Sequence, residues 1–225
     1  MALADVKPMT EREFEEQFDL KHLPSDHRKK FLQIFKRNKQ AFSMSAKDIG
    51  KAKDIEMDIE LDRPQPRIQK YIPIPHTLRP QVRQILDQLL KFGVIRKCPE
   101  PSLYCSNLIC VKKKDGKDIR IIFDGRPLNM DTTRLPMMLI TKQEVMAHMC
   151  GKEIVSTLDV SDAFFTIPLK AEAQPLTAFW SESLGDRFCF TRAPQGLKNS
   201  PLYLKLIMDK IFGNLAHYVL HYSDD

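Results

Sequence analysis

Apolar residues recur at helical spacing near the start of the chain. Two segments carry this pattern, Glu11–Phe18 and Ser25–Phe42, and the second places Phe31, Ile34 and Phe35 on one face. No residue in either segment forms a pattern typical of catalysis. We therefore predict two helices that serve a connecting or packing role.

Five prolines between Arg63 and Pro80 predict a domain boundary. Proline fixes φ and removes a hydrogen-bond donor, so this stretch is expected to run extended rather than as a helix or a central strand. We assign residues 1–62 to an N-terminal helical connector and residues 63–225 to the main domain. The main domain opens with a helix that Gly93 closes and whose apolar positions are Leu78, Val82, Ile85, Leu86 and Leu89.

A hairpin is predicted next. Leu108–Val111 and Ile119–Ile122 are strand-like, and Asp115-Gly116 between them is a strong hairpin-turn signal. The connecting residues, Lys112-Lys113-Lys114-Asp115-Gly116-Lys117, give the tip four lysines. Taken alone, such a turn is more typical of a solvated surface than of a binding site.

Three further apolar runs predict strands, at Ile154–Leu158, Phe188–Phe190 and Ala216–His221. Asn199–Pro201 opens a helix, with Ser200 as the expected N-cap, and Gly213 ends it. Its buried side is expected to carry Leu202, Leu206 and Phe212. Because helices and strands are mixed from residue 78 onward, the predicted fold class is α+β.

Charge and cysteine content narrow the functional classes. The chain of 225 residues has a net charge of +6, which favours polyanionic partners, although a merely soluble basic surface explains it equally well. Five cysteines without a Cys-x-x-Cys pair are typical of reduced thiols in an intracellular protein, and they do not distinguish a cytoplasmic particle from the nucleus. No secretory signal and no run of membrane-spanning length occurs, so we expect no membrane partner.

Acidic residues follow two of the predicted strands. Asp159 comes directly after the first, and Asp224 and Asp225 come shortly after the last. Hard divalent cations bind carboxylate oxygens, and phosphoryl transfer to a sugar hydroxyl uses two such ions roughly 4 Å apart. We therefore expect these three acids to bind two Mg²⁺ ions, with Mn²⁺ as a substitute. Asp224 is expected to be the stronger ligand of the adjacent pair, because successive strand residues face opposite sides.

Four ordered segments carry a family resemblance. LDVSDAFF at 158–165 resembles the first palm motif of retroviral and long-terminal-repeat retrotransposon reverse transcriptases, and PQGLKNSP at 194–201 resembles their second motif. YSDD at 222–225 resembles their Tyr-x-Asp-Asp motif, and KKKDGKDIRIIFDGRPLN at 112–129 resembles their fingers hairpin. Each segment alone is a weak signal, but their order and spacing agree with the family, and gypsy-type polyproteins look most similar.

The resemblance implies an RNA-directed DNA polymerase that adds nucleotides from dNTP to a primer on an RNA or DNA template. The implied fold is a right-hand arrangement of fingers and partial palm, with an antiparallel palm sheet and helices packed on one face. The carbonyl of Val160 would assist Asp159 in binding metal. Backbone N–H groups of Asp162 and Ala163 would hold the triphosphate.

The resemblance also assigns side chains to the nucleotide. Phe164 would lie under the deoxyribose and exclude a 2′-hydroxyl, while Phe165 fills a core position. Lys113 and Arg120 would clamp the triphosphate, with Lys112 or Lys114 replacing Lys113 if the register shifts by one. Gln195 would contact the sugar or the template strand.

Some features depart from the family or favour other interpretations. Asp124 and Arg126 are expected to form a structural pair, and Gly125 between them stands where the family usually has an aromatic residue. Because no return strand, thumb or ribonuclease H pattern follows Asp225, we expect a truncated polymerase chain. A retroelement remnant that only binds nucleic acid is the main alternative. A metal-dependent phosphohydrolase is a weaker one, since it explains neither Phe164 nor the lysine-rich turn.

Overall fold

The computed structural model describes residues 13, 16, 18, 20–42, 49–112, 118–138 and 140–222. Its contacts divide the chain into two compact units, Met1–Ile49 and Gly50–Asp225. Each unit has its own packing and is described separately.

The first unit is built on α2 (Ser25–Arg37), which is shorter than the helix predicted to run to Phe42. The chain leaves the α-helix at Asn38 and continues as a short 3₁₀ turn, η1 (Lys39–Ala41). The ring of Phe35 lies 4.3 Å from that of Phe18 and 5.2 Å from that of Phe42, so aromatic contacts hold this unit together. The helix predicted over Glu11–Phe18 lies largely outside the described residues.

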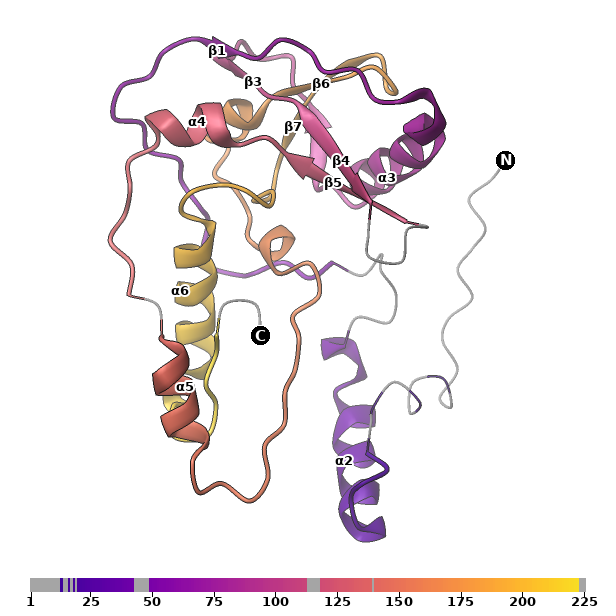
Figure 1. The fold of residues 1–225 in the computed structure, drawn as a ribbon, viewed down its shortest axis with the longest axis vertical. Coiled ribbons are helices and arrows are strands. Elements are labelled where there is room, and N and C mark those ends of the chain that lie inside the picture. The colour runs from indigo at the N-terminus through magenta and orange to yellow at the C-terminus, as the bar shows by residue number, and fades with distance from the viewer. Residues whose placement is uncertain are drawn as a thin grey trace. The chain divides into compact units, whose positions relative to one another are not determined.

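The second unit is an α+β domain, as predicted, with its sheets grouped at one end and α6 extending away from them (Figure 1). Its helices are α3 (Arg79–Lys91), α4 (Arg126–Asp131), α5 (Lys142–Met149) and α6 (Ser200–Phe212). Its strands are β1 (Arg67–Ile68), β2 (Ile95–Lys97), β3 (Tyr104–Cys105), β4 (Leu108–Lys112), β5 (Ile119–Phe123), β6 (Phe179–Ser181) and β7 (Asp186–Phe190). Short 3₁₀ turns occur at η2 (His76–Leu78), η3 (Ala163–Thr166), η4 (Gln174–Thr177) and η5 (Gly213–Leu215).

The main sheet is antiparallel, with strand order β2-β7-β6. β7 pairs with β2 through Ile95 opposite Phe190, and with β6 through Phe179 opposite Phe188. The hairpin β4–β5 forms in the register that its turn signal predicts, with Val111 opposite Arg120. β1 and β3 form a small parallel pair.

The core of the second unit lies where α3 meets the strands. α3 buries Val82, Leu86 and Leu89, three of the five apolar positions expected on this helix. The rings of Phe123 and Phe190 meet edge to face at 5.6 Å and join the hairpin to the main sheet. Gly93 ends the helical region in the left-handed conformation at φ +63°, which glycine adopts without strain.

Residues 50–62 form a strap, meaning an extended segment that lies along the second unit. Met57 is 1% exposed, donates from its N–H to the Pro168 carbonyl at 2.7 Å and accepts from the Lys170 N–H at 3.0 Å. Asp58 forms an ion pair with Lys170 at 2.9 Å, and the hydrogen bond from Lys170 lowers the pKa of this carboxyl. The compact unit therefore starts at Gly50, earlier than the boundary predicted after residue 62.

Two of the predicted strands do not form. Ile154–Leu158 and Ala216–His221 are assigned no strand, and within the described part of the chain neither has a hydrogen-bonded strand partner. Ile154 and Leu158 are 63% and 65% exposed, so their apolar character does not lead to burial. A strand is stable only when a second strand satisfies its backbone groups, which explains why these apolar runs stay irregular.

α6 differs from its prediction in its cap and its buried face. Its N-cap is Asn199 rather than Ser200, and no side-chain cap bond is made. The buried apolar residues are Leu204, Ile207 and Met208, whereas Leu206 is 44% exposed. Pro201 lies in the first turn, as expected.

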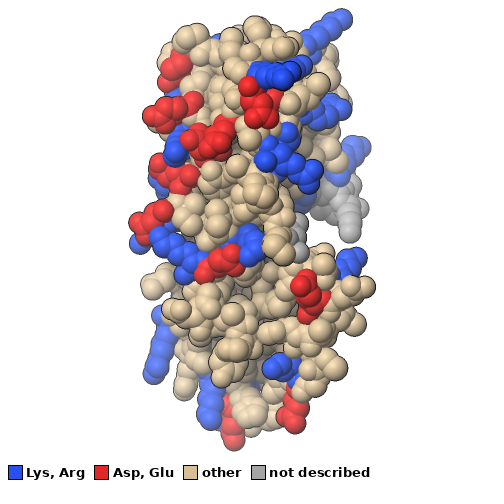
Figure 2. Space-filling model, turned by 90° about the vertical axis from the view of Figure 1, so that its left-hand side faces the viewer, with Lys and Arg blue, Asp and Glu red and all other residues tan. Residues whose placement is uncertain are grey.

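Both signs of charge occur along the face drawn in Figure 2, and neither forms a continuous field there. Several basic residues of the second unit are paired with acids, such as Arg67 with Asp131 and Lys170 with Asp58. No described helix is both long and apolar enough to cross a membrane. On this face, the net positive charge therefore does not correspond to a uniformly basic surface.

Candidate active site

The predicted site residues come from three separate elements. Arg120 lies on β5 with an exposed side chain, opposite Val111. Asp159 and Val160 lie on the extended segment that leads into η3. Gln195 lies in the loop between β7 and α6 and is exposed. The predicted ligands Lys113, Asp224 and Asp225 lie outside the described residues.

The turn at Asp162 is sharp. Asp162 adopts the left-handed conformation at φ 47° and ψ 44°, and η3 begins at the next residue, Ala163, which is buried. A non-glycine residue in this region is uncommon and costs conformational energy, so the surrounding structure must hold it. Phe165 stacks on Phe190 at 6.2 Å and 14°, which anchors the turn to the main sheet, and its side chain is partly rather than fully buried.

One cavity of about 210 Å³ brings these elements together. Its lining contains seven residues that the sequence assigned to the site: Arg120, Asp159, Val160, Asp162, Ala163, Phe164 and Gln195. Ile121 and Phe165 complete the wall. A cation, an acid and a partly buried aromatic ring therefore face one space, which suits a ligand that carries phosphate, metal and a sugar.

The residues present suit a divalent cation only in part. Asp159 offers carboxylate oxygens and Val160 a carbonyl at the same cavity, and both are hard donors of the kind that Mg²⁺ prefers. Among the described residues there is no group of three or more His, Cys, Asp or Glu side chains that could enclose a metal. A complete site would need the acids predicted at 224 and 225.

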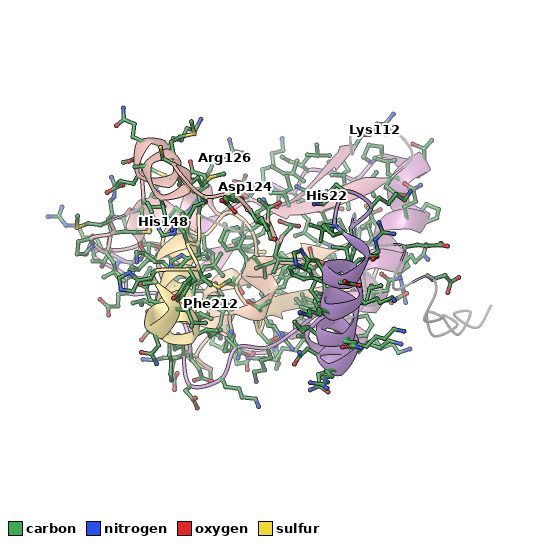
Figure 3. The ribbon with its side chains drawn as sticks, turned by 90° about the horizontal axis from the view of Figure 1, so that it is seen from below. His22, Lys112, Asp124, Arg126, His148 and Phe212 are labelled. Carbon is green, nitrogen blue, oxygen red and sulfur yellow. The ribbon has the colours of Figure 1, made fainter. Side chains whose placement is uncertain are left out.

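A buried carboxylate supports the start of α4 (Figure 3). Asp124 accepts two hydrogen bonds from the Arg126 guanidinium, both at 2.7 Å, and one from the Gln69 amide at 2.8 Å. Arg126 holds the pKa of Asp124 down to about 2, and Gln69 adds to this effect. The predicted structural pair is thus confirmed. Gln69 also accepts from the Asn107 N–H, which ties the pair to the segment before β4.

A second ion pair supports α4 from its other end. Asp131 accepts from Arg67 at 2.6 and 2.7 Å and from the Tyr104 hydroxyl at 2.9 Å. Arg67 lowers the pKa of Asp131 to about 2. Sequence reasoning missed this network, because its three members are separated along the chain and none belongs to a recognisable motif.

Two larger cavities share no lining residue with the cavity at the predicted site, although the first includes Tyr222 of the Tyr-Ser-Asp-Asp motif. One of about 360 Å³ lies between α6 and the segment that leads to Tyr222. At its wall, the Nε2 of His221 lies within hydrogen-bond distance of the Asp209 Oδ1, at 2.9 Å. The other, of about 550 Å³, is lined by Arg134–Met137 and the start of α6. Cavity size alone would therefore not have selected the site that the sequence motifs select.

The comparisons with known proteins identify the family. The model of the family described as reverse transcriptase (RNA-dependent DNA polymerase) matches residues 111–225, just over half of the chain. The chain belongs to the reverse transcriptase family. It is 32% identical over 161 residues to the Pro-Pol polyprotein of Simian foamy virus type 1, which supports the predicted relationship to retroviral polyproteins.

Solved reverse transcriptases share the fold. The prototype foamy virus protease-reverse transcriptase (a CSH mutant) has a TM-score of 0.81 and 26% identity over 96% of this chain. The foamy viral protease-reverse transcriptase in complex with RNA/DNA hybrid has a TM-score of 0.81 and 22% identity over all of this chain, which shows the fold alone. The reverse transcriptase chain described here covers 13% of the Pro-Pol polyprotein, and 28% and 30% of these two solved chains.

Proposed function

We propose that this chain carries the fingers and part of the palm of an RNA-directed DNA polymerase. The observation that carries the proposal is one cavity that is lined by Arg120, Asp159, residues of the η3 turn and Gln195. These elements are distant in sequence, and the sequence motifs assign each of them to nucleotide or metal binding. Membership of the reverse transcriptase family supports the same reaction, which adds dNMP to a primer 3′-end and releases pyrophosphate.

In this proposal the chain's own residues position the incoming nucleotide. Arg120 binds the triphosphate by charge, together with Lys113, and the N–H groups of Asp162 and Ala163 provide further donors at the turn. Phe164 is partly buried at the same cavity and selects deoxyribose by occupying the space that a 2′-hydroxyl would need. Gln195 contacts the sugar or the template strand from the opposite loop.

Asp159, the Val160 carbonyl, Asp224 and Asp225 would hold the two Mg²⁺ ions. Bound there, divalent ions lower the pKa of the attacking hydroxyl and neutralise charge on the phosphates. The template and primer are RNA or DNA, as the complex of a foamy viral relative with RNA/DNA hybrid suggests. Within the family, the four ordered motifs lead us to propose a gypsy-type polyprotein as the parent.

Primer extension tests the polymerase proposal. The wild-type chain, Asp159→Asn and a control, Asp87→Asn, are incubated with an RNA template, a DNA primer, dNTP and Mg²⁺. Asp87 is a matched aspartate on α3, outside the cavity and paired with Arg83. We expect extension by the wild type and the control, loss of extension in Asp159→Asn, and loss on chelation of the metal. Extension that survives in Asp159→Asn would refute the assignment of this acid.

A binding-only function has one observation in its favour. Residues 154–159 have no strand partner among the described residues and are exposed, so the segment that carries Asp159 lacks the support of a sheet. This alternative predicts salt-sensitive binding to primer–template without extension. Filter binding at several salt concentrations, run beside the extension assay, distinguishes the two functions.

A further inference from the structure

We propose that Asn129 is a positioning residue for Gln195 and that Gly125 provides the space this requires. The inference rests on the proposed polymerase function and deepens it, because it names what fixes the loop that reaches the nucleotide. We call Gly125 and Asn129, with the loop residues Gly196 and Lys198 that they touch, the corner clamp.

Both polar atoms of the Asn129 side chain contact the loop that carries Gln195. Its Nδ2 donates to the Gly196 carbonyl at 2.7 Å, and its Oδ1 accepts from the Lys198 N–H at 2.8 Å. An amide is the side chain suited to this pair of bonds, since it offers one donor and one acceptor side by side. The part of the loop that follows Gln195 is thus held by a single side chain.

Neighbouring residues reinforce the clamp. The Lys198 ammonium donates to the Thr132 carbonyl at 2.6 Å, and the Asn199 amide donates to the Thr133 carbonyl at 2.9 Å. Hydrogen bonds therefore join the segment from Asn129 to Thr133 to the loop from Gly196 to Asn199 along its length. By contrast, Gln195 itself is exposed, so its position depends on the residues beside it.

Gly125 is needed for this close approach rather than for its backbone freedom. Its φ of −72° suits any residue. A Cβ at this position, however, would lie 2.7 Å from the Gly196 carbonyl oxygen and 3.3 Å from the Asn129 Nδ2. The first distance is shorter than real Cβ contacts and the second is tight, so a larger residue must shift this loop relative to the start of α4. Gly196 is itself at a position that favours glycine, since its φ is +110° and a Cβ built on it would lie 3.1 Å from the Phe123 carbonyl.

The clamp has a consequence for nucleotide binding. Gln195 lines the same cavity as Arg120 and Phe164, and the clamp residue Gly196 comes directly after it in the sequence. A displacement of this loop would move Gln195 without touching the acids or the η3 turn. We therefore expect the clamp to govern the KM for dNTP more than the catalytic rate constant.

Two substitutions test the clamp, each with a matched control. Asn129→Asp keeps an acceptor for the Lys198 N–H but places a second oxygen against the Gly196 carbonyl, and Gly125→Ala introduces the overlapping Cβ. The controls are Asn214→Asp and Gly213→Ala at the end of α6, where Gly213 has φ −53° and no atom within 4 Å of a Cβ. Steady-state primer extension with varied dNTP gives KM and kcat for all five chains.

We expect each clamp variant to raise the KM for dNTP about tenfold or more with a smaller change in kcat, because a contact that binds the nucleotide equally in the ground and transition states affects KM and not kcat. Hydrogen exchange should show faster exchange of the Lys198 amide in Asn129→Ala, which removes its acceptor. Both controls should match the wild type in KM and kcat.

The outcomes separate the clamp from the polymerase function. An active wild type whose clamp variants keep its KM, or an Asn129→Ala chain with unchanged Lys198 exchange, overturns the clamp alone. Clamp variants that lose both kcat and thermal stability but keep the KM for dNTP indicate a merely structural role, and this result also overturns the clamp. An inactive wild type overturns the polymerase function, and the nucleotide role of the clamp with it.

Discussion

The pair of Asp124 and Arg126 allows a prediction that can be worked out from the structure. Asp124→Asn keeps the shape of the side chain but removes the charge that Arg126 and Gln69 contact. Its new NH₂ group would face a donor, either the Arg126 guanidinium or the Gln69 amide, because Asp124 now accepts from both. The side chain of Asp124 is 2% exposed, so water cannot easily satisfy that group.

The pH-dependent part of the loss follows from the pKa of Asp124. Its fall from the ordinary value of 3.8 to about 2 corresponds to roughly 2.5 kcal/mol, since each pKa unit is worth about 1.36 kcal/mol. Because Arg126 is 79% exposed and solvent screens the pair, we reduce this contribution to about 1–2 kcal/mol. A lowered folded-state pKa stabilises the protein above pH 3.8, and this stabilisation is lost as the pH falls towards about 2.

Urea unfolding followed by circular dichroism measures this contribution. Because pH 2.5 still lies above the folded-state pKa of about 2, about two-thirds of this contribution is lost by then, so the free energies of unfolding of the wild type and Asp124→Asn should differ by about 0.7–1.3 kcal/mol more at about pH 6 than at about pH 2.5. Asp87→Asn serves as the control, since an exposed pair with Arg83 should contribute less than about 1 kcal/mol. A difference between wild type and Asp124→Asn that is constant over this pH range would refute the charged pairing of Asp124.

Three further predictions concern packing, backbone conformation and thiol reactivity. Leu86→Ala should lower the free energy of unfolding by about 2–5 kcal/mol in urea titrations, because Leu86 is fully buried in α3; a loss below about 1 kcal/mol would contradict this burial. Gly93→Ala should cost about 1–2 kcal/mol in the same titration through backbone strain alone, since no atom lies within 4 Å of its Cβ position, and a neutral result would contradict the positive φ. In alkylation mapped by mass spectrometry, exposed Cys150 should react in the native state, while burial, which raises the pKa of Cys189 to about 12, should protect Cys189 until unfolding; equal rates would contradict this difference.

Sequence reasoning succeeded where the structure depends on neighbouring residues. The hairpin of β4 and β5 is specified by its own Asp-Gly turn and by alternating residues on each side. The helix α3 is specified by its apolar spacing and by Gly93. The residues that line the candidate cavity were assigned to a site from short motifs whose order along the chain is typical of one family, and their roles there stay predictions.

Sequence reasoning failed where a partner is distant along the chain. Ile154–Leu158 and Ala216–His221 have the composition of strands, but a strand also needs a second strand, and composition does not show whether one is present. The role of Asn129 was missed for a related reason. Its contact with Gly196 joins residues 67 positions apart, and an asparagine in a short helix gives no sign of such a partner.

The strap at residues 50–62 also constrains the order in which the parts of the protein can fold. Met57 contacts Ser200 through its sulfur, and the Asp58 N–H bonds with the hydroxyl of Tyr203, at separations of 143 and 145 residues. During synthesis, the strap leaves the ribosome long before these partners exist, so its apolar residues must wait exposed while most of the chain is translated. Contacts of such long range are slow to form, and we expect docking of the strap to be a late step in folding. A nascent chain halted before residue 168 would lack both backbone partners of Met57 and leave this apolar residue exposed, which makes the strap a natural place for a chaperone to bind.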